Sequence, residues 1–529
     1  MSIATQAAPS SEEALLLIER LLAFARQQEL LHELDVPYGR NALLDLFGFA
    51  EPYGGVVPAE TTDNVSELLE PLLDYGCSIG LVPAYTTTQR DLLDARIMGL
   101  LMPRPSEAAA SFRERAEREG LSSATDAFYR MNIASNYIRM DRIASNLYWQ
   151  HETSYGNLEM TINLSKPEKD PQEIAKLRSM PQGHYPRCLL CADNVGYAGR
   201  IDHPARQNLR VLPLQLGGED WCFQYSPYVY YNEHSIVLKA AHEPMSISPD
   251  TFVRLLDFVE QFPHYFIGSN ADLPIVGGSI LSHDHFQAGR HVFPMETAKV
   301  EAYFTDDGNP GVSIGIVEWP MSVIRLNGAS RSAVLEAANR ILDAWRGYSD
   351  ASAEVLAWTE REGGIRESHN TVTPIARLRD NGEYELDLVL RNNRTSSEHP
   401  DGIFHPHRSL HHIKKENIGL IEVMGLAVLP GRLSEELKSL SLYLTPDAIE
   451  SIDKLGQADH PLHKHGEWLA SLAENHGTAN SNAQAWAIMQ HETGERFLDV
   501  LTDAGVFKRT ERGREAFHQF LASAGASPK

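Results

Sequence analysis

The segment with the most reactive side chains is DLPIVGGSILSHDHFQAG, residues 272–289. If residues 280–287 are extended, His283, His285 and Gln287 share one face, because side chains alternate along a strand. Two imidazoles and an amide then point at one place, just after a Gly-Gly-Ser bend whose backbone N–H groups could hold an anion. This layout suits a histidine that attacks phosphorus while the phosphate is held in line.

A His-x-His pair alone is a weak signal, because a chain with 22 histidines contains about one by chance. The chain has three, His283/His285, His405/His407 and His463/His465. A lone pair is more often a solvated loop or a satisfied core group than a site, and we interpret the last pair in that way. The first pair differs because two glycines, a serine and a glutamine adjoin it.

The 272–289 segment resembles the signature of the type 2 galactose-1-phosphate (hexose-1-phosphate) uridylyltransferases, distant members of the histidine-triad superfamily. Three further segments carry the same resemblance: YPRCLLC at 185–191, FQYSPYVYYNEH at 223–234 and HHIKKENIGLIEVMG at 411–425. The resemblance covers most of the chain and is weakest beyond about Leu433. It implies an α+β fold with a duplicated histidine-triad-like antiparallel-sheet core and helical N-terminal and C-terminal parts.

The implied reaction moves UMP from UDP-glucose to galactose 1-phosphate through a covalent uridylyl-histidine, which splits one displacement into two. By the resemblance His285 is the nucleophile, and imidazole suits this role because a fixed tautomer leaves one ring nitrogen free to attack. The alternative is that His283 reacts and His285 is structural. Gln287 is expected to hydrogen-bond an oxygen of the transferring phosphate.

The substrate-binding prediction rests on the same resemblance. Its residues are Asn270 for the nucleotide, Gly277, Gly278 and Ser279 for the phosphate, and the basic pair Lys166 and Lys169. A plain tight turn is the alternative for the Gly-Gly-Ser segment. Further basic candidates, each otherwise a solvated surface charge, are Arg206, Arg290, Lys414 and Lys415. The aromatic run 225–231 could wall a uracil pocket or simply form a buried strand.

Cys188 and Cys191 have the spacing that lets two thiolates hold one tetrahedral metal ion, although such a pair can also be redox-active or accidental. The other class of uridylyltransferases completes such a structural zinc site with two histidines, and the matching positions in this chain are His242 and His283. His234 is the second choice for the third ligand. The sequence also leaves open a second metal site. Its candidates by chain order are Glu301, His369, His405 and His407, which could instead contact sugar or phosphate or lie at a strand end.

Composition excludes several classes of protein. With 529 residues, 43% hydrophobic and 22% charged, the chain has ample material for two or three globular domains. No apolar run reaches the ~18 residues of a membrane helix, and the N-terminus lacks the pattern of a secretory signal. Four cysteines form no disulfide framework, which predicts the cytoplasm. The net charge of −24 disfavours nucleic acid and anionic membranes but not a small nucleotide. A homodimer is left open.

Hydrophobic periodicity predicts helical regions at 1–150 and 434–529, with strand-rich segments between them. The resemblance implies that these segments form two histidine-triad-like halves, the first at 151–326 with the reactive motif and the second at 327–433. A capping box at Ser10–Glu13 starts the first helix. Further predicted helices are 92–101, 111–119, 250–261 and 333–348. Predicted strands are 157–164, 210–216, 229–231, 236–239, 314–326, 370–378, 384–391 and 418–429.

Two other functions use the same residues. One is a histidine-triad-type nucleotide hydrolase or phosphorylase, and the other is a zinc-stabilised nucleotide-binding protein without chemistry. Labelled UDP-glucose separates them, because transfer leaves labelled protein, hydrolysis releases UMP, and a binding protein does neither.

Overall fold

The computed structural model describes residues 8–83, 85–165, 183–278, 280–306, 308–446, 452–455, 457 and 459–529. The chain divides into two compact units that alternate along the sequence. The first unit takes in Met1–Ser145, Ser165–Val229 and Glu233–Glu243, and the second takes in Asn146–Leu164, Tyr230–Asn232 and Pro244–Lys529. The division into four consecutive regions stays a prediction.

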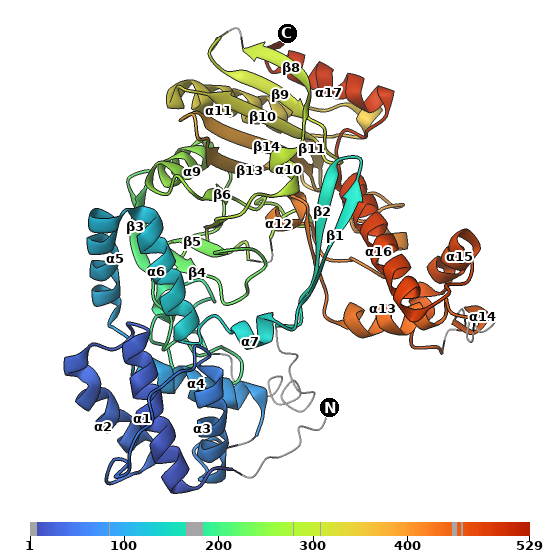
Figure 1. The fold of residues 1–529 in the computed structure, drawn as a ribbon. Helices are drawn as coiled ribbons and strands as arrows, with labels where there is room; N and C mark the ends of the chain where they lie inside the picture. The colour runs from blue at the N-terminus through green and yellow to red at the C-terminus, as the bar shows by residue number, and fades with distance from the viewer. Residues whose placement is uncertain are drawn as a thin grey trace. The chain divides into compact units, whose positions relative to one another are not determined.

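The first unit begins with a series of helices (Figure 1). They are α1 Ser11–Gln27, α2 Val36–Phe47, α3 Ser66–Ser78, α4 Thr87–Gly99, α5 Pro105–Glu119, α6 Leu121–Ala134 and α7 Met140–Ile143, with the short 3-10 helix η1 Glu33–Asp35 before α2. The predicted capping box is confirmed, because the Ser10 side chain accepts from the Glu13 N–H while the Glu13 carboxylate accepts from the Ser10 N–H. The segments 92–101 and 111–119 fall largely within α4 and α5.

Three antiparallel strands complete the first unit: β3 Leu212–Leu216, β4 Glu219–Tyr225 and β5 Ser235–Lys239. A short turn, η2 Ala192–Asn194, precedes them. The phenol of Tyr225 is fully buried and donates to the carbonyl oxygen of Thr125 at 3.1 Å, which fastens α6 to β4. The predicted strand 229–231 is wrong, because residue 229 is irregular and residues 230–231 form a bend.

The second unit is built on a long antiparallel run of strands. Their spatial order is β16 Ala526–Pro528, β8 Val300–Asp306, β9 Ser313–Val317, β10 Val323–Gly328, β14 Tyr384–Asn392, β13 Asn370–Leu378, β6 Phe266–Gly268 and β7 His285–Gly289. The predicted strand 370–378 is confirmed in full, and 384–391 gains one residue. The predicted strand 314–326 is two strands, because a bend at residues 318–321, which includes Trp319 and Pro320, separates β9 from β10. Antiparallel sheets with flanking helices confirm the α+β class.

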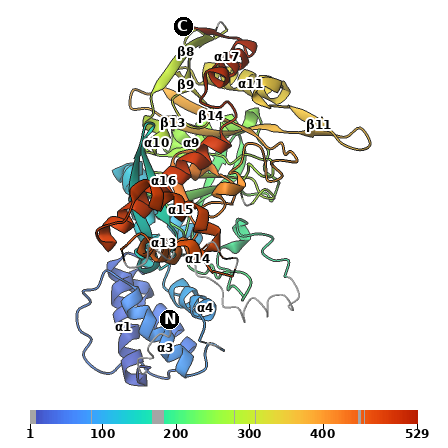
Figure 2. The same ribbon diagram turned by 90° about the vertical axis from the view of Figure 1, so that its right-hand side faces the viewer.

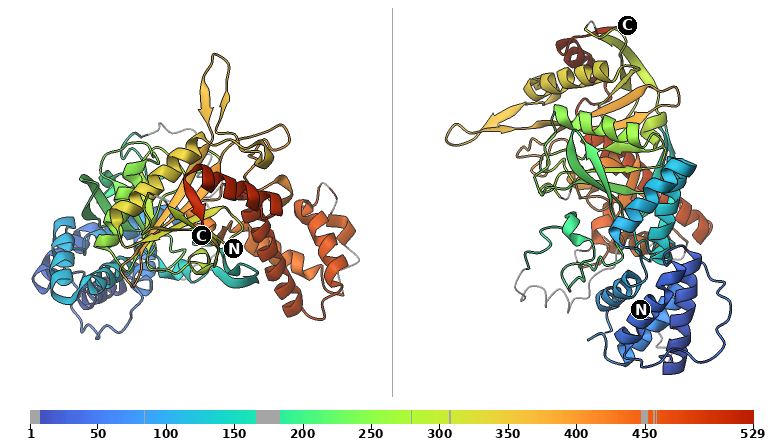
Figure 3. Two further views of the ribbon diagram at one scale, coloured as in Figure 1. Left: turned by 90° about the horizontal axis from the view of Figure 1, so that it is seen from above. Right: turned by 90° about the vertical axis from the view of Figure 1, so that its left-hand side faces the viewer.

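Helices α9 Pro249–Gln261 and α11 Arg331–Gly347 pack against this sheet (Figure 1). Further helices of the second unit are α10 Pro294–Thr297, η3 Ala351–Ala353, η4 Arg408–Leu410, α13 Arg432–Leu442, α14 Ile452–Leu455, η6 His463–His465, α15 Gly466–His476, α16 Asn482–Ala504 and α17 Glu511–Ser523. A hairpin of β11 Trp358–Glu360 and β12 Arg366–Ser368 projects away from the sheet (Figures 2 and 3).

A smaller sheet in the second unit joins β1 Leu147–Thr153, β2 Gly156–Ile162 and β15 Leu426–Leu429. The pairing of β15 with β2 is parallel, whereas β1 and β2 form a hairpin. The predicted strand 418–429 is therefore only partly correct, because its first part is the short helix α12 Leu420–Val423. A single helical turn looks like a strand when all of its residues are buried and most are apolar, as in Leu420-Ile421-Glu422-Val423.

The reactive motif differs from its predicted form. Strand β7 begins at His285, and residues 281–284 form a bend and an irregular link instead of an extended segment. His285 and Gln287 therefore share one face of a strand as predicted, whereas His283 precedes the strand. Gln287 lies opposite Gly268 of β6, and β6 pairs with β13, so the motif is anchored to the interior of the second unit.

Candidate active site

The side chain of His285 is buried and is held by a backbone carbonyl of the same chain segment. Its Nδ1 lies 2.8 Å from the carbonyl oxygen of His283, two residues earlier. A carbonyl can only accept, so Nδ1 carries the proton and Nε2 of the neutral ring keeps its lone pair. Burial lowers the pKa of His285 to about 4, and the bond to the His283 carbonyl opposes that shift. The ring is neutral at physiological pH, with Nε2 as a potential nucleophile.

Gln287 supplies an amide on the same strand face. Its Oε1 is buried and has no hydrogen-bond partner among the described residues. Buried amide atoms are normally paired, so an unpaired one calls for an explanation such as a missing ligand. The two ends of an amide are distinguished only by their hydrogen bonds, so this group can offer a donor or an acceptor there.

Close backbone approach requires both glycines of the predicted cradle. A Cβ on Gly277 would lie 2.5 Å from the carbonyl oxygen of Ala271, and a Cβ on Gly278 would lie 2.9 Å from Nδ2 of Asn270. Gly277 also forms an isolated parallel bridge with Ala271. The turn between them contains Ile275 at φ +73°, a conformation that a β-branched residue adopts only under strain. The chain here is a tight loop folded onto itself, and Ser279 lies outside the described residues.

Asn270 fastens this loop to a segment far along the sequence. Its Oδ1 accepts from the backbone N–H of Leu420 at 2.8 Å, which satisfies one of the free donors at the start of α12. In the same segment the side chain of Asn417 donates to the carbonyl oxygen of Gly277 at 3.3 Å. The predicted contact of Asn270 with a nucleotide stays a prediction. The structure gives this residue a positioning role beside the motif.

A buried ion pair lies in the same C-terminal segment. Nζ of Lys414 donates to Oε1 of Glu422 at 2.7 Å, and Oε2 of Glu422 accepts from the N–H of Gly419 at 3.0 Å. Lys414 is therefore paired with a carboxylate, and Lys415 is exposed. The roles of Asn417 and Glu422 were not predicted from the sequence. The conspicuous HHIKKENIGLIEVMG segment was the available signal, but its pairing with residues 270–277 is a tertiary contact.

The predicted cysteine pair does form a candidate metal centre within the first unit. Sγ of Cys188 and Sγ of Cys191 are 3.5 Å apart, and Sγ of Cys191 is 3.1 Å from Nδ1 of His242. The N–H of Leu190 donates to Sγ of Cys188, and Nδ2 of Asn194 donates to the carbonyl oxygens of both cysteines at 2.8 Å. These bonds hold the loop in the shape that places the donors together. Two sulfurs and an imidazole are a donor set that suits zinc.

His234, the second choice for the third zinc ligand, is bonded elsewhere. Nδ1 of His234 lies 2.6 Å from the carbonyl oxygen of Tyr228, and burial lowers the pKa of His234 to about 4. His242, and not His234, therefore lies with the two cysteines. His283, the predicted fourth ligand, belongs to the second unit, where it is fully buried.

The four candidates for a second metal are not brought together. Glu301 forms a bidentate ion pair with Arg509 at 2.6 and 2.7 Å. The ring of His369 is held between Asn393 and Thr359. His405 bonds the carbonyl oxygen of Pro406, and His407 bonds that of Ile403 and lies 3.3 Å from Asp503. Each candidate already has its own partners, so the second site proposed on these residues is not supported.

The described members of the remaining basic and aromatic candidates contact other residues of the protein. Lys166 and Lys169 lie outside the described residues. The guanidinium of Arg206 lies over the ring of Tyr137 at 5.5 Å, and the backbone carbonyl of Arg290 accepts from Asn232. The two ends of the aromatic run, Tyr225 and Tyr231, are buried, which favours the core interpretation over a uracil wall.

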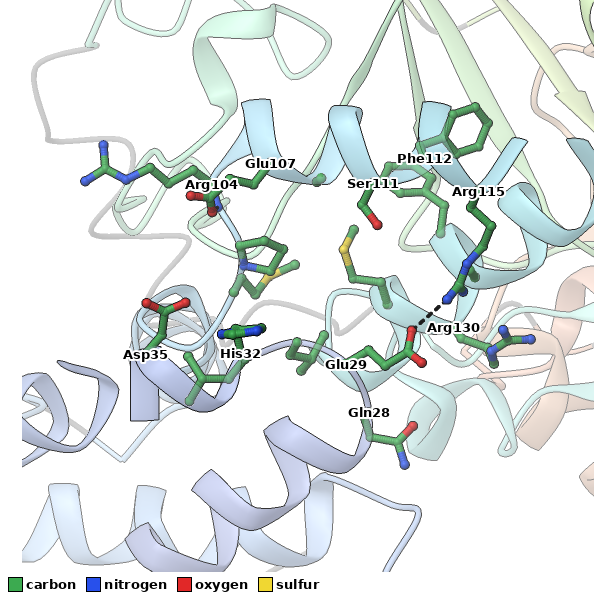
Figure 4. A pocket seen from close by; sticks show the side chains of 18 of the residues that line it. Gln28, Glu29, His32, Asp35, Arg104, Glu107, Ser111, Phe112, Arg115 and Arg130 are labelled. Carbon is green, nitrogen blue, oxygen red and sulfur yellow. Dashed lines mark hydrogen bonds and ion pairs between the residues drawn. The ribbon is translucent and has the colours of Figure 1, made fainter. Parts of the chain in front are cut away.

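Two cavities lie within the first unit. One of about 700 Å³ contains Arg115 and Glu29, which pair at 3.0 Å (Figure 4). The other, about 860 Å³, is lined by several arginines, among them Arg139 and Arg142, which both pair with Asp91. The described part of the 272–289 motif lines neither cavity, so neither is assigned to the nucleophile.

Comparisons with known proteins identify the family of this chain. The model "Galactose-1-phosphate uridyl transferase, N-terminal domain" matches residues 55–244, and "Galactose-1-phosphate uridyl transferase, C-terminal domain" matches residues 258–447. The galactose-1-phosphate uridylyltransferase of Caldanaerobacter subterraneus subsp. tengcongensis is 57% identical over 516 residues, 98% of this chain and 99% of that protein. Its namesake in Bacillus subtilis is 50% identical over 514 residues, 97% and 98% of the two chains.

Structural similarity adds little. The crystal structure of yeast Ap4A phosphorylase Apa2 covers 62% of this chain and 97% of its own, with 11% identity and a TM-score of 0.28, a level that establishes no common fold. The sequence matches place the protein among the nucleotidyltransferases. Within that class, the chain belongs to the galactose-1-phosphate uridylyltransferase family.

Gly277→Ala tests the packed loop. The added Cβ, at 2.5 Å from the Ala271 oxygen, must push the loop away from residue 271, so we expect the free energy of unfolding to fall by about 1–3 kcal/mol and sugar exchange to fall with it. Urea unfolding and exchange rates measure both. Gly311→Ala is the control, because nothing lies within 4 Å of a Cβ there. Equal behaviour of the two variants would contradict the close-packed loop.

Proposed function

We propose that this protein transfers the uridylyl group of UDP-glucose to galactose 1-phosphate through a covalent bond between the uridylyl phosphorus and Nε2 of His285. The products are UDP-galactose and glucose 1-phosphate. One observation carries the proposal: Nδ1 of the buried His285 is committed to the His283 carbonyl at 2.8 Å, which leaves Nε2 unprotonated. Family membership supplies the substrate class.

The first half-reaction consumes no proton. The lone pair of Nε2 attacks the phosphorus of the uridylyl group, a P–N bond forms, and the P–O bond to glucose 1-phosphate breaks with its electron pair leaving on that phosphate. The ring becomes positively charged, and its Nδ1–H bond to the His283 carbonyl strengthens as the charge develops. In the second half-reaction a phosphate oxygen of galactose 1-phosphate attacks the same phosphorus. The P–N bond breaks, and its electron pair returns to Nε2.

Gln287 is proposed to bind a non-bridging oxygen of the transferring phosphate. Its amide lies two residues from the nucleophile on the same strand face, and one buried end lacks a partner among the described residues. A neutral amide can donate a hydrogen bond to the phosphate but cannot protonate Nε2 of His285, whereas a nearby lysine ammonium could. The glycine loop at 277–278, with Ser279, is proposed to bind phosphate through backbone N–H groups, and Asn270, Lys166 and Lys169 remain proposed substrate contacts.

Burial favours transfer over hydrolysis. His285 is 6% exposed, so few water molecules reach Nε2 once a sugar phosphate fills the site. A hydrolase or phosphorylase would need water or inorganic phosphate to be admitted to the intermediate. The relatives in the comparisons are named as uridylyltransferases, and neither this alternative nor a non-catalytic binding protein is favoured by them.

The cysteine centre is proposed to hold a structural zinc ion with Cys188, Cys191 and His242, and His283 is proposed as its fourth ligand. Zinc bound in this way supplies a rigid cross-link and no redox chemistry. Burial raises the pKa of the Cys188 thiol, so metal binding must displace a proton there. The carbonyl oxygen of His283 accepts the hydrogen bond from Nδ1 of His285. Coordination of the zinc ion by the His283 side chain would therefore also fix the position of this carbonyl, which orients the nucleophile.

The protein is proposed to act on small molecules in the cytoplasm. None of the four cysteines forms a disulfide bond, as a reducing compartment favours. No helix within the described part of the chain is both long and apolar enough to cross a membrane. The lack of nucleic-acid binding and the homodimer stay predictions.

His285→Asn is expected to reduce sugar exchange by on the order of 10⁴-fold or more, because the covalent path is lost. Gln287→Ala removes one transition-state hydrogen bond and is expected to lower the exchange rate by on the order of 10²-fold.

Initial rates of the wild-type enzyme, measured with both substrates varied, are expected to give parallel double-reciprocal lines. The matched control is His463→Asn, an exposed histidine of another His-x-His pair, which is expected to retain full activity.

Retention of a tenth of wild-type exchange by His285→Asn would contradict the nucleophile assignment. Intersecting double-reciprocal lines would indicate direct transfer in a ternary complex and would leave His285 an orienting role.

Cys191→Ser is expected to lower zinc content and melting temperature together, since metal binding and folding are coupled. Cys222→Ser is the control, because this partly buried thiol of β4 is outside the centre, and it is expected to keep its zinc. Metal analysis and thermal unfolding of the purified proteins provide the comparison. Wild-type protein without zinc, with both Cys188 and Cys191 reactive toward a thiol reagent in the native state, would rule the centre out.

A further inference from the structure

A second group of side chains that could bind a metal ion lies within the second unit, and none of its members was predicted from the sequence as a site residue. It consists of His151 on β1 and His491 and Glu495 on α16. One nitrogen or oxygen atom of each side chain lies within 4.8 Å of the others. Strand β1 runs beside α16 in Figures 1 and 2, and the two elements are in contact.

The helix presents its two ligands on one face. His491 and Glu495 are four residues apart, which places them one turn apart on the same side of α16. His151 is 3% exposed, and its Nε2 lies 2.8 Å from Oε1 of Glu495. The rings of His151 and His491 are 4.9 Å apart between centroids. All three polar ends therefore converge from two elements.

The packing of α16 is shaped around His151. A Cβ on Gly494 would lie 2.2 Å from Cγ of His151, so the imidazole rests directly on the helix backbone between the two helical ligands. A glycine inside a helix costs about 1 kcal/mol relative to alanine, and here it allows this approach. Two residues before His151, the indole of Trp149 donates to the carbonyl oxygen of Gln490 at 3.2 Å and fixes the strand's position along the helix.

A hydrogen bond between His151 and Glu495 would account for two of the three side chains but not for the third. The ring of His491 is exposed and makes no hydrogen bond to the described residues, although it lies against His151. Ligand atoms bound to one zinc ion at about 2.1 Å are at most about 4.2 Å apart. To bind one ion, the three ligand atoms need only a small rotation of the exposed His491 ring. The proton that lies between Nε2 of His151 and Oε1 of Glu495 must also leave Nε2 when the metal binds.

We propose that His151, His491 and Glu495 bind a divalent transition-metal ion, Zn²⁺ in the first instance. Two imidazoles and one carboxylate are a donor set that such ions accept, and the exposed side leaves further coordination positions to water. The ion fastens the β1–β2 hairpin to helix α16. This centre contains no sulfur, which distinguishes it from the cysteine centre of the first unit.

Cobalt titration of the full-length, chelator-stripped protein tests the proposal. Co²⁺ bound by cysteines shows a thiolate-to-metal charge-transfer band, whereas Co²⁺ bound by histidine and carboxylate shows only weak visible bands. We expect wild-type protein to bind a cobalt ion of the second kind. Glu495→Gln and His491→Ala are each expected to weaken that ion's binding by at least about 10-fold and to leave any thiolate band unchanged. Glutamine keeps a hydrogen bond to His151, so the first variant preserves the fold.

Glu492→Gln is the matched control, because Glu492 lies on the same helix but pairs with His476 at 2.6 Å. It is expected to bind both kinds of cobalt as the wild type does. Zn²⁺ is further expected to raise the melting temperature of wild type and Glu492→Gln more than that of Glu495→Gln. The proposal is overturned if all the cobalt that the wild-type protein binds shows the thiolate-to-metal band, or if the protein binds no cobalt. Unchanged affinity for that ion in both Glu495→Gln and His491→Ala would also overturn it.

Discussion

The hydrogen bond from Nδ1 of His285 to the carbonyl oxygen of His283 is the constraint on which the active site depends. It needs a bend at 282–283, so β7 cannot begin before His285. It fixes the tautomer of a ring whose pKa burial lowers to about 4, so Nε2 is unprotonated without a neighbouring base. A buried imidazole without this bond could attack through either nitrogen, and its ring could turn away from the phosphate.

Contacts over long sequence separations hold that local arrangement. Asn270 binds the start of α12 and packs against Gly278, while Asn417 reaches the carbonyl of Gly277. The loop before β7 is thus clamped between segments about 150 residues apart in the chain, as the pairing of Asn270 with Leu420 shows. Such pre-organisation lets donors meet developing charge without rearrangement, which is the main source of electrostatic catalysis. The strain at Ile275 is sustained by this packing.

Much of this was predictable, and the failures have physical reasons. Period-two spacing placed His285 and Gln287 on one face, and the Cys-x-x-Cys spacing placed two thiols at one centre. The start of β7 was misplaced because periodicity cannot register a side-chain bond to the preceding carbonyl. Glu301 and His369 were grouped by chain order, but their partners Arg509 and Asn393 come from tertiary folding. The histidine and glutamate pair on α16 was missed because its third member lies 340 residues away in sequence, in β1.

The most direct test of covalent transfer is to incubate the protein briefly with UDP-glucose alone and to map the labelled peptide by mass spectrometry at alkaline pH, where phosphoramidates survive. A uridylyl group on His285, with one glucose 1-phosphate released per active site, is the predicted result. Release of glucose 1-phosphate with the label on His283, or no labelled protein when exchange with galactose 1-phosphate is rapid, would contradict attack by Nε2 of His285.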